Sequence, residues 1–499
     1  MGANLADLVR SAAADRGEHV ALVSGGRSVT WAQVDTAVDA AAAGLQALGL
    51  SAGDRVALVV GNIPEFVYAY FGILRAGLVA VPANTGFTSA ELGWLLNDTG
   101  ARAIVFDRTG AAAARGVPAP QSGPPLRVVI GAPAPGEVAF GSFYGTPREH
   151  DTDPEDLALL MYTSGTSGHP KGAMLSHRAL LASVEQVHSL PNPPVTPDDI
   201  VLVVLPLFHI YALNGTLAAV ARCGAAAVLL DRFDPVQTLE VVREQGVTNI
   251  PGAPPMFVAW SETPGLADAF AGVRLLMTGA APMPAAVLEQ IRTTTGLPVF
   301  EGYGLTEASP GVTSTLVGGH AKPGSVGRSL PGVQIRLVDD EGELAEEGDP
   351  GEIQVRGPNL FSGYWPDGDG GPDAEGWYGT GDVAYEDDDG DLVLVDRRKE
   401  LVIVSGFNVY PREVEDAVLT HPAVAEVAVL GVPHPYTGEA VKAYVVPRRG
   451  ARIAPSDVIA HVATRLARFK WPTIIEIVPE LPHSATGKVA KGRLREGSR

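Results

Sequence analysis

The chain has 499 residues, which is more than a single hydrophobic core usually organises, so its length predicts two to four structural units. Its 37 Lys and Arg residues against 57 Asp and Glu residues give a formal net charge of -20 at pH 7. This charge argues against general binding to nucleic acid or to anionic lipid surfaces, so an anionic ligand needs a local site. The single cysteine, Cys223, excludes an intramolecular disulfide, and its apolar setting in ARCGAAAVLL predicts that it packs.

Nothing in the sequence predicts insertion into a membrane. The first residues, MGANLADLVRSAA, lack the long apolar core of a signal peptide, and Ala6 stands where a myristoylation signal requires Ser or Thr. No run of eighteen or more apolar residues predicts a membrane span. With one cysteine and no such segment, the chain is expected in the cytoplasm.

Helix-like and strand-like segments alternate from about residue 30 to residue 106. Thr30 and Gln33 form a T-x-x-Q capping pattern ahead of a helix-forming run that ends in glycine. A strand, a helix, a strand, a helix and a strand are then expected at 55–60, 64–77, 79–83, 89–100 and 101–106. Such alternation predicts a parallel sheet covered by helices.

The rest of the chain changes character twice. Residues 107–150, rich in Pro, Gly and Ala, are expected to form loops with one or two short strands. The α/β alternation resumes at about residue 156 and continues to about residue 310. Short strands separated by turns predict a small β subdomain from about 320 to 396, and residues 397–499 carry a strand and helix pattern of their own.

Within MYTSGTSGHPKG at 161–172, residues 163–171 combine four Ser and Thr hydroxyls, two glycines and a lysine. A loop of this composition can present backbone N–H groups and hydroxyls to phosphate oxygens, and Lys171 adds positive charge; a helix is expected from near Ser176. The spacing is not that of a Walker loop, and Pro170 precedes the lysine. A plain turn explains the composition about equally well, so the loop alone does not name a reaction.

Seven motifs occur in order along the chain. They are MYTSGTSGHPKG at 161–172, LPLFHIYALNG at 205–215, TGAAPMP at 278–284, EGYGLTE at 301–307, WYGTGD at 377–382, DRRKELVIVSGFNVYPREVE at 396–415 and PHSATGKVAK at 482–491. This set closely resembles the adenylate-forming superfamily of acyl-CoA synthetases, luciferases and adenylation domains, and above all its bacterial fatty-acyl-CoA ligases. The resemblance covers nearly the whole chain.

The resemblance implies a fold and a reaction. The fold is α/β: an N-terminal AMP-binding domain of two α/β subdomains and a small β-barrel-like subdomain at 1–396, a hinge at 397–400, and a smaller mobile α+β domain at 401–499. The reaction is that of an AMP-forming acid-thiol ligase with ATP and CoA as substrates and Mg²⁺ as cofactor. A carboxylate attacks the α-phosphate of ATP to give acyl-adenylate and pyrophosphate, and the CoA thiol then attacks the acyl carbon and releases AMP. A free carboxylate is a poor electrophile, so the protein must position the reactants and stabilise charge that develops on phosphate.

The resemblance also assigns the nucleotide contacts. The residues expected to contact the β- and γ-phosphates are Thr163, Ser164, Gly165, Thr166, Ser167, Gly168 and Lys171. The residues expected to form the adenine slot and its surroundings are Gly279, Ala280, Ala281, Pro282, Glu301, Gly302, Tyr303 and Gly304. Thr306 is expected at the α-phosphate, Asp382 at both ribose hydroxyls, and Arg397 at the ribose or a phosphate. Outside their motifs, these charged residues would read as ordinary turn residues.

The metal and the catalytic lysine follow from two further motifs. Glu307, with Thr163, is expected to hold Mg²⁺, for which a carboxylate is a suitable ligand. Lys488 matches the lysine that bridges the attacking carboxylate and the α-phosphate. One such preorganised donor lowers an activation barrier by about 3 kcal/mol. Away from its motif, a lysine near a C-terminus is usually just solvated.

For the second step the resemblance implies that the C-terminal domain rotates. Lys399 then occupies the hinge, and the stretch that contains Ser405, Gly406 and Phe407 comes toward the active site, where Gly406 lets the pantetheine arm of CoA pass. His209 matches an aromatic position that borders the acyl pocket and gates access for the thiol. Alone, His209 would read as a hydrogen-bonded core histidine.

The acid pocket is expected from residues 207–216, 250–257, 278–284 and 300–309. None of these segments contains Lys or Arg, so a second substrate carboxylate would be costly to bury and malonate-like acids are disfavoured. A medium- or long-chain fatty acid is favoured, with a coumarate-type aryl acid next. Delivery to a carrier protein, a non-catalytic acyl-nucleotide binder and a luciferase-like oxidation are the alternatives. No nucleic-acid partner is expected; a monomer or homodimer, and peripheral membrane contact through the basic stretch after Lys470, stay open.

Overall fold

The computed structural model describes residues 3–118, 125–163, 170–281, 283–339, 341–397, 402–404, 407–434, 438–466, 468–483 and 488–496. The chain forms two compact units. The first unit contains residues up to 323 together with 327–334 and 356–377, and the second contains 324–326, 335–355 and 378 onward. Among the residues described, no helix has both the length and the apolar character needed to cross a bilayer.

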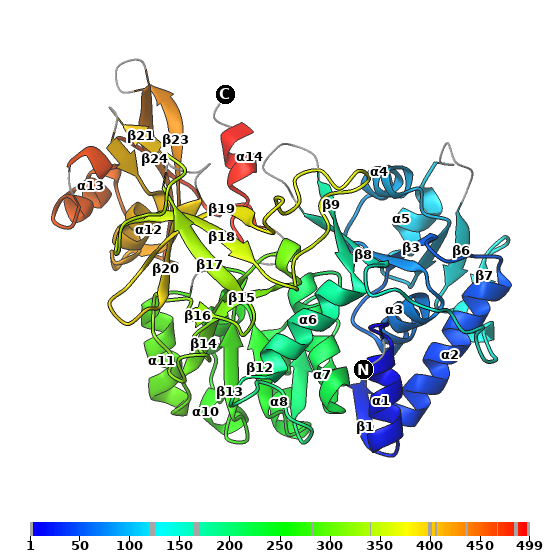
Figure 1. Ribbon diagram of the computed structural model, residues 1–499. Helices are drawn as coiled ribbons and strands as arrows, with labels where there is room; N and C mark the ends of the chain where they lie inside the picture. Colours follow the sequence, from blue (N-terminus) through cyan, green and yellow to red (C-terminus); the bar gives the residue numbers. More distant parts are fainter. Residues whose placement is uncertain are drawn as a thin grey trace. The chain divides into compact units, whose positions relative to one another are not determined.

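A seven-stranded sheet organises the N-terminal part of the first unit (Figure 1). Its order is β7 (Val138–Ala139), β6 (Leu126–Val129), β5 (Ala103–Phe106), β3 (Arg55–Val59), β4 (Val79–Pro82), β8 (Leu157–Thr163) and β9 (Lys171–Ser176). All neighbours are parallel except β8 and β9. The four residues of β5 are all buried, as expected where both faces of a parallel sheet are covered.

The helices between these strands agree with the sequence patterns. In α2 (Trp31–Ala47), the Thr30 hydroxyl accepts from the Gln33 N–H and the Gln33 side chain accepts from the Thr30 N–H, so the predicted capping box is confirmed. Helices α3 (Pro64–Arg75) and α2 pack so closely that a Cβ at Gly72 would lie 2.6 Å from the Cβ of Ala41. Helix α4 (Ser89–Thr99) also begins with a capping box.

One expectation for residues 107–150 is wrong. The region contains the two short strands β6 and β7, but also helix α5 (Ala111–Gly116), where loops alone are expected. The sequence of α5, AAAARG, is rich in alanine, which has the highest helix propensity. Its buried residues Ala113 and Ala114 join the same core as α4, which adds tertiary packing to that propensity.

A nine-stranded sheet forms the other half of the first unit. Its order is β16 (Arg328–Ser329), β15 (Gly311–Ser314), β14 (Val299–Gly304), β13 (Leu275–Thr278), β12 (Asn249–Gly252), β10 (Ile200–Val203), β11 (Ala226–Leu229), β1 (Val20–Ser24) and β2 (Arg27–Thr30). The strands from β14 to β1 are parallel. The helices of this half are α1 (Asp7–Arg16), α6 (His177–His188), α7 (Ala219–Cys223), α8 (Pro235–Glu244), α9 (Pro254–Ser261), α10 (Leu266–Ala269) and α11 (Ala285–Thr295). Trp260 of α9 centres an apolar core with edge-on contacts to Phe257 and Phe270.

The second unit contains two smaller sheets. One has the order β17 (Gln334–Val338), β18 (Gly351–Arg356), β19 (Tyr378–Glu386) and β20 (Leu392–Arg397). The other has the order β22 (Phe407–Val409), β21 (Val402–Val404), β24 (Gly438–Pro447) and β23 (Val424–His434), with β25 (Ile474–Ile477) paired to β24. The predicted boundary at 397–400 stays a prediction, and residues 398–400 lie outside the described part of the chain.

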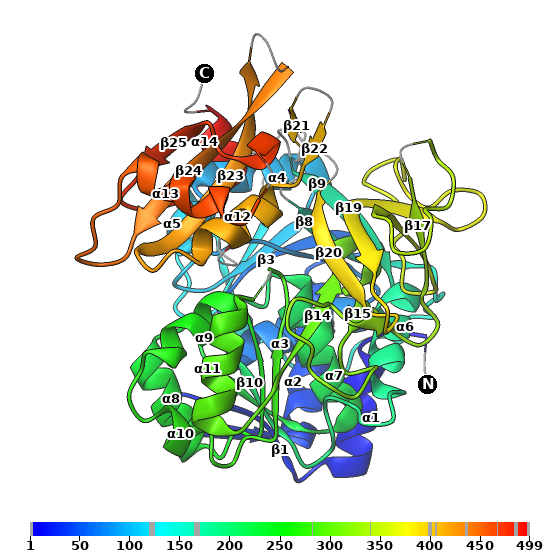
Figure 2. The same ribbon diagram turned by 90° about the vertical axis from the view of Figure 1, so that its left-hand side faces the viewer.

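Strand β23 lies in the last sheet (Figure 2), and its successive residues belong to two different cores. Val427 and Val429 join a core with α12 (Pro411–Leu419) and α13 (Pro455–Ala463), whereas Ala428 and Leu430 join a second core that contains Leu494 of α14 (Lys491–Glu496). Successive strand residues point to opposite faces, so helices cover both sides of this sheet.

Candidate active site

The loop predicted to hold phosphates connects two antiparallel strands. Thr163 at the end of β8 pairs with Lys171 at the start of β9. Helix α6 begins directly after Ser176, whose hydroxyl accepts from the Ala179 N–H, as expected, and strand β9 separates it from the loop. The predicted phosphate contacts Ser164, Gly165, Thr166, Ser167 and Gly168 lie outside the described residues. Of the predicted phosphate contacts, the structure therefore places Thr163 and Lys171.

Tyr162, beside Thr163, stays uncharged at neutral pH. Burial, followed by its hydrogen bond to the carboxylate of Asp98, raises the pKa of Tyr162 above its ordinary value. The tyrosine thus anchors the end of β8 as a neutral donor.

Glu307 and Lys171 meet around one tyrosine. Glu307 lies on a short 3-10 helix, Thr306–Ala308, and is 8% exposed. The Tyr364 hydroxyl donates to Glu307 Oε1 at 2.5 Å, and Lys171 Nζ lies 5.0 Å from the centroid of the same ring. Within the described part of the chain, Glu307 Oε2 has no hydrogen-bond partner. A hard, nearly buried carboxylate oxygen of this kind fits the predicted role of a Mg²⁺ ligand.

The predicted adenine slot lies at the carboxyl ends of two neighbouring parallel strands. Thr278 at the end of β13 pairs with Glu301 in β14, so Gly279, Ala280 and Ala281 follow one strand where Gly302, Tyr303 and Gly304 end the next. Crevices outside the carboxyl ends of parallel strands are the usual ligand sites of α/β sheets. The structure thus brings seven of the predicted slot residues together, while Pro282 lies outside the described residues.

One glycine of this slot, Gly279, lies beside a second tyrosine. A Cβ added at Gly279 would lie 3.5 Å from the carbonyl oxygen of Gly302 and 3.6 Å from Cε1 of Tyr211. Burial raises the pKa of Tyr211, so its phenol stays protonated. The buried Thr278 hydroxyl has no hydrogen-bond partner among the described residues. Buried hydroxyls usually have a hydrogen-bond partner, and a ligand in the predicted slot would supply one to Thr278.

His209 precedes a π-helix, Tyr211–Ala218, that packs on the turn of Glu307. The His209 ring lies 4.7 Å from the ring of Phe208, centroid to centroid. The side-chain amide of Asn214 donates to the Ser309 carbonyl at 2.6 Å, and a Cβ at Gly215 would lie 3.3 Å from Pro310. π-Helical turns are rare and are frequently found at functional sites. The acyl gate predicted at His209 stays a prediction.

The predicted ribose residues lie on neighbouring strands of the second unit. Asp382 in β19 is the Cα partner of Arg397 in β20. The turn before Asp382 is held by Thr380, whose hydroxyl accepts from the Asp382 N–H and donates to the Ile353 carbonyl. Gly381 adopts a φ of 74°, which favours glycine at this position. The backbone thus places Asp382 and Arg397 side by side.

Lys488 lies next to Val489, whose backbone is held within the second unit. His483 and Val489 form a β-bridge, and the Ala490 N–H donates to the Pro482 carbonyl at 2.7 Å. Lys488 is exposed. It is followed by α14, whose Lys491 forms a 2.9 Å ion pair with Glu415 of α12. The backbone on the C-terminal side of Lys488 is therefore anchored.

The remaining predicted residues belong to the segment after β20. Lys399, Ser405 and Gly406 lie outside the described residues, and Phe407 belongs to β22, where its backbone pairs with Val404. The predicted hinge and CoA-channel roles therefore stay predictions.

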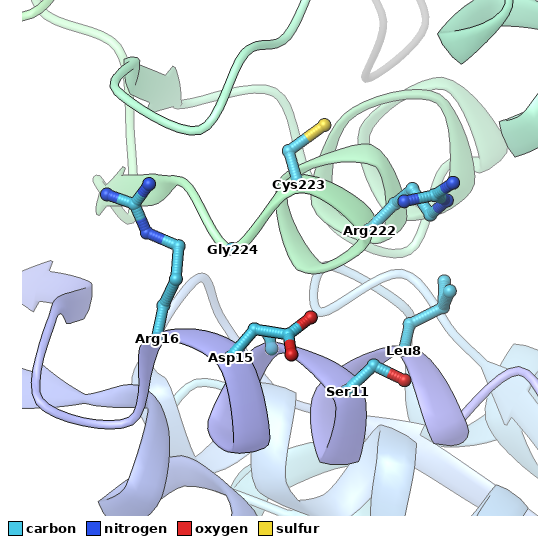
Figure 3. Close-up of a pocket in the computed structure, with 8 residues that line it drawn as sticks. Leu8, Ser11, Asp15, Arg16, Arg222, Cys223 and Gly224 are labelled. Carbon is cyan, nitrogen blue, oxygen red and sulfur yellow. The ribbon is translucent and has the colours of Figure 1, made fainter.

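A small cavity lies elsewhere in the first unit. It has a volume of about 70 Å³ and lies between α1 and α7, with Asp15, Arg16 and Cys223 in its lining (Figure 3). Cys223 is buried and its pKa is raised to about 11 by burial, which disfavours the reactive thiolate. The expectation that Cys223 packs is confirmed, and no predicted site residue lines this cavity.

Two contributors to the site were missed from the sequence. Tyr364 stands in FSGYWPDG, outside the seven motifs, and Asn214 stands inside LPLFHIYALNG but was given no role. Asn214 has a signal, because a polar residue within an otherwise apolar helical run needs a buried partner. Tyr364 has no such signal in the sequence: it stands in a Gly- and Pro-rich stretch, and its partner Glu307 is 57 residues away.

Comparisons with known proteins find similarity over nearly the whole chain. The sequence model of the family described as "AMP-binding enzyme" matches residues 9–365, and that described as "AMP-binding enzyme C-terminal domain" matches residues 413–488. The long-chain-fatty-acid–CoA ligase of Bacillus subtilis (strain 168) is 33% identical over 94% of this chain and 90% of its own. A feruloyl-CoA synthase of Amycolatopsis sp is 37% identical over 94% of each chain. The crystal structure of ATP-bound MatB from Rhodopseudomonas palustris superposes with a TM-score of 0.91 at 33% identity, covering 100% of this chain and 99% of that one.

Proposed function

Because this chain belongs to the AMP-binding enzyme family and is similar over nearly its whole length to acyl-CoA ligases, we propose that it joins a monocarboxylic acid to CoA. The reaction consumes ATP, passes through an acyl-adenylate, and releases pyrophosphate and AMP. The observation that carries the proposal is the arrangement in the first unit: a lysine and a carboxylate around Tyr364, joined through the turn at Pro310 to a glycine-lined slot.

The chain's own residues divide the work of the first step. Lys171 offers positive charge to phosphate oxygens, and the slot at Gly279 and Gly302 admits the flat base. Asp382 accepts from ribose hydroxyls, and Lys488 stabilises the charge that accumulates as the carboxylate meets the α-phosphate. Glu307 with Thr163 would hold Mg²⁺, which when bound supplies further positive charge to the phosphates.

The favoured acid is a medium- or long-chain fatty acid. The four segments expected to line the acid pocket contain no Lys or Arg, so the pocket suits a substrate whose only charge is the reacting carboxylate. The similarity to a long-chain-fatty-acid–CoA ligase supports an alkyl chain. We place the protein in the cytoplasm as a monomer or homodimer.

An aryl acid is the second candidate. The ring of Tyr211 lies against the slot beside Gly279, where a flat acid can stack. The similarity to a feruloyl-CoA synthase supports the same reading.

A panel of acids separates these candidates. Purified protein is incubated with ATP, Mg²⁺ and one acid, with and without CoA, while AMP release and thioester mass are measured. The acids are octanoate, laurate, palmitate, 4-coumarate, ferulate and malonate. We expect CoA-dependent thioesters with the fatty acids and none with malonate. Thioester from ferulate alone selects the aryl reading, and AMP release without any CoA thioester contradicts the ligase proposal.

A further inference from the structure

Tyr364 contacts two predicted functional groups of opposite charge. Its hydroxyl donates to Glu307 Oε1 at 2.5 Å, and the face of its ring lies under Lys171 Nζ at 5.0 Å from the centroid. All three residues belong to the first unit and are described. No ion pair joins Lys171 to Glu307 within the described part of the chain, and each of the two side chains contacts Tyr364 instead.

The backbone around Tyr364 is anchored on two sides. Toward β9, the Met174 N–H donates to the Gly363 carbonyl at 3.0 Å and the Trp365 N–H donates to the Gly172 carbonyl at 2.8 Å. Toward the Glu307 turn, the Phe361 N–H donates to the Glu307 carbonyl at 2.9 Å. The segment is therefore fixed to both the strand that begins at Lys171 and the short helix that carries Glu307.

The ring is also oriented from its edge. Phe361 packs edge-on against Tyr364, with ring centroids 5.0 Å apart and planes at 73°. This contact is separate from those to Glu307 and Lys171, and edge-to-face aromatic pairs favour one geometry over others. The tyrosine thus has little freedom to leave its two charged neighbours.

We propose that Tyr364 is the positioning residue that orients Glu307 toward the metal and holds Lys171 toward the phosphates. This inference rests on the proposed function, which assigns the metal to Glu307 and phosphate to Lys171. The phenol holds Oε1, which leaves Oε2 for the cation, in the way that partners of metal ligands orient them. The ring face holds the ammonium by a cation–π contact and keeps it from neutralising the carboxylate.

Two substitutions separate the hydroxyl from the ring. Tyr364→Phe removes the hydrogen bond to Glu307 and keeps the ring under Lys171, whereas Tyr364→Leu removes both. Tyr70→Phe is the matched control, since Tyr70 is fully buried and its hydroxyl has no hydrogen-bond partner among the described residues. A cooperative thermal unfolding transition shows that a variant is folded. If Tyr364→Leu is not folded, Tyr364→Phe alone tests the proposal.

The readout is nucleotide binding measured by isothermal titration calorimetry, with ATP in excess Mg²⁺ and ATP in EDTA. We expect Tyr364→Phe to weaken binding by about 10-fold in Mg²⁺ and to leave binding in EDTA unchanged, because only the metal ligand is released. Tyr364→Leu weakens binding in both conditions, because Lys171 is released as well. Tyr70→Phe matches the wild-type protein in both.

Glu307→Gln distinguishes a failure of this inference from a failure of the metal assignment. If Glu307→Gln abolishes the Mg²⁺ dependence of binding while Tyr364→Phe leaves it intact, the role of Tyr364 is refuted and the metal assignment stands. If Glu307→Gln leaves the Mg²⁺ dependence intact, the metal assignment itself is refuted. If the metal assignment and the role of Tyr364 are both correct, Tyr364→Phe has no further effect on Mg²⁺-dependent binding in the Glu307→Gln background.

Discussion

Two glycines of the slot differ in the space around them. A Cβ at Gly279 would make ordinary van der Waals contacts with Gly302 and Tyr211, whereas a Cβ at Gly304 would overlap the carbonyl oxygen of Pro310. The overlapped atom belongs to the backbone next to the Glu307 turn, where the Leu305 N–H also donates to the Pro310 carbonyl. A methyl group therefore fits at the first glycine, whereas the second permits two backbone segments to approach closely.

This difference predicts opposite outcomes for the same substitution. We expect Gly304→Ala to lower the free energy of unfolding by about 1–3 kcal/mol, because the backbone must shift to admit the methyl group. Gly279→Ala should leave stability within about 0.5 kcal/mol of the wild-type value. Urea unfolding followed by fluorescence measures both, and equal stabilities for the two variants would contradict the argument.

At the scale of elements, a buried histidine connects the N-terminal segment to helix α6. The Nδ1 atom of His177, the first residue of α6, accepts from the Leu5 N–H at 3.1 Å, and His177 is 2% exposed. Burial, opposed by Asp156 and reinforced by His150, lowers the pKa of His177 from 6.5 to about 4. The folded protein therefore keeps this acceptor neutral.

This shift predicts acid sensitivity. Below pH 6.5 the unfolded chain binds a proton at His177, whereas the folded protein binds it only near pH 4. The free energy of unfolding therefore decreases as the pH is lowered from 6.5 to 4. The loss is ~3 kcal/mol, since each pH unit corresponds to about 1.4 kcal/mol. His177→Asn keeps an acceptor without the titration, so its urea midpoint should fall less between pH 7 and pH 4 than that of the wild-type protein. The exposed His320→Asn variant should keep the wild-type slope.

The helix after Lys488 is held by an ion pair. Lys491 of α14 and Glu415 of α12 have side chains 15% and 18% exposed, and Glu415 also accepts from the Val429 N–H at 2.7 Å. Exposed ion pairs contribute little, but removing one partner of a mostly buried pair leaves an uncompensated charge. The pair therefore links α14, and with it the backbone next to Lys488, to the core of the last sheet.

Weakening this link should slow adenylate formation. Glu415→Gln keeps an acceptor for Val429 and removes the charge, so we expect ATP–pyrophosphate exchange to fall about 10-fold as Lys488 loses its fixed position. Glu476→Gln is the control, because Glu476 pairs with Lys442 but is 53% exposed. An unchanged exchange rate in Glu415→Gln would show that α14 does not position Lys488.

At the scale of the whole molecule, a substitution at Lys488 should slow the first chemical step and leave the second largely unaffected. Lys488→Ala is expected to lower acid-dependent ATP–pyrophosphate exchange by about 10²-fold or more, because it removes the donor assigned to the first step. Thioester formation from chemically prepared acyl-adenylate and CoA should stay within a few fold of the wild-type rate, since the proposed mechanism gives Lys488 no part in that step. Equal losses in both half-reactions would point to a structural role for the lysine instead.

The sequence predicted most elements of the first unit and left out what depends on distant contacts. The capping box at Thr30, the alternation from β3 to β5 and helix α6 after Ser176 were read correctly, because they depend on residues a few positions apart. Helix α5 was missed because the Pro and Gly content around it outweighed its alanines. Tyr364 was missed because neither its spacing nor its neighbours distinguish it from a core aromatic residue.

The sequence by itself determined the family and the residue types of the site, since seven motifs in order and the helix and strand periodicity are properties of the chain read locally. Only the tertiary structure decided which of these residues meet in the first unit. Parallel pairing of β13 with β14 brings Gly279 beside Gly302, and packing of the 361–365 segment on β9 places one tyrosine between Glu307 and Lys171. Such contacts arise from the packing of segments far apart along the chain, which no local pattern records.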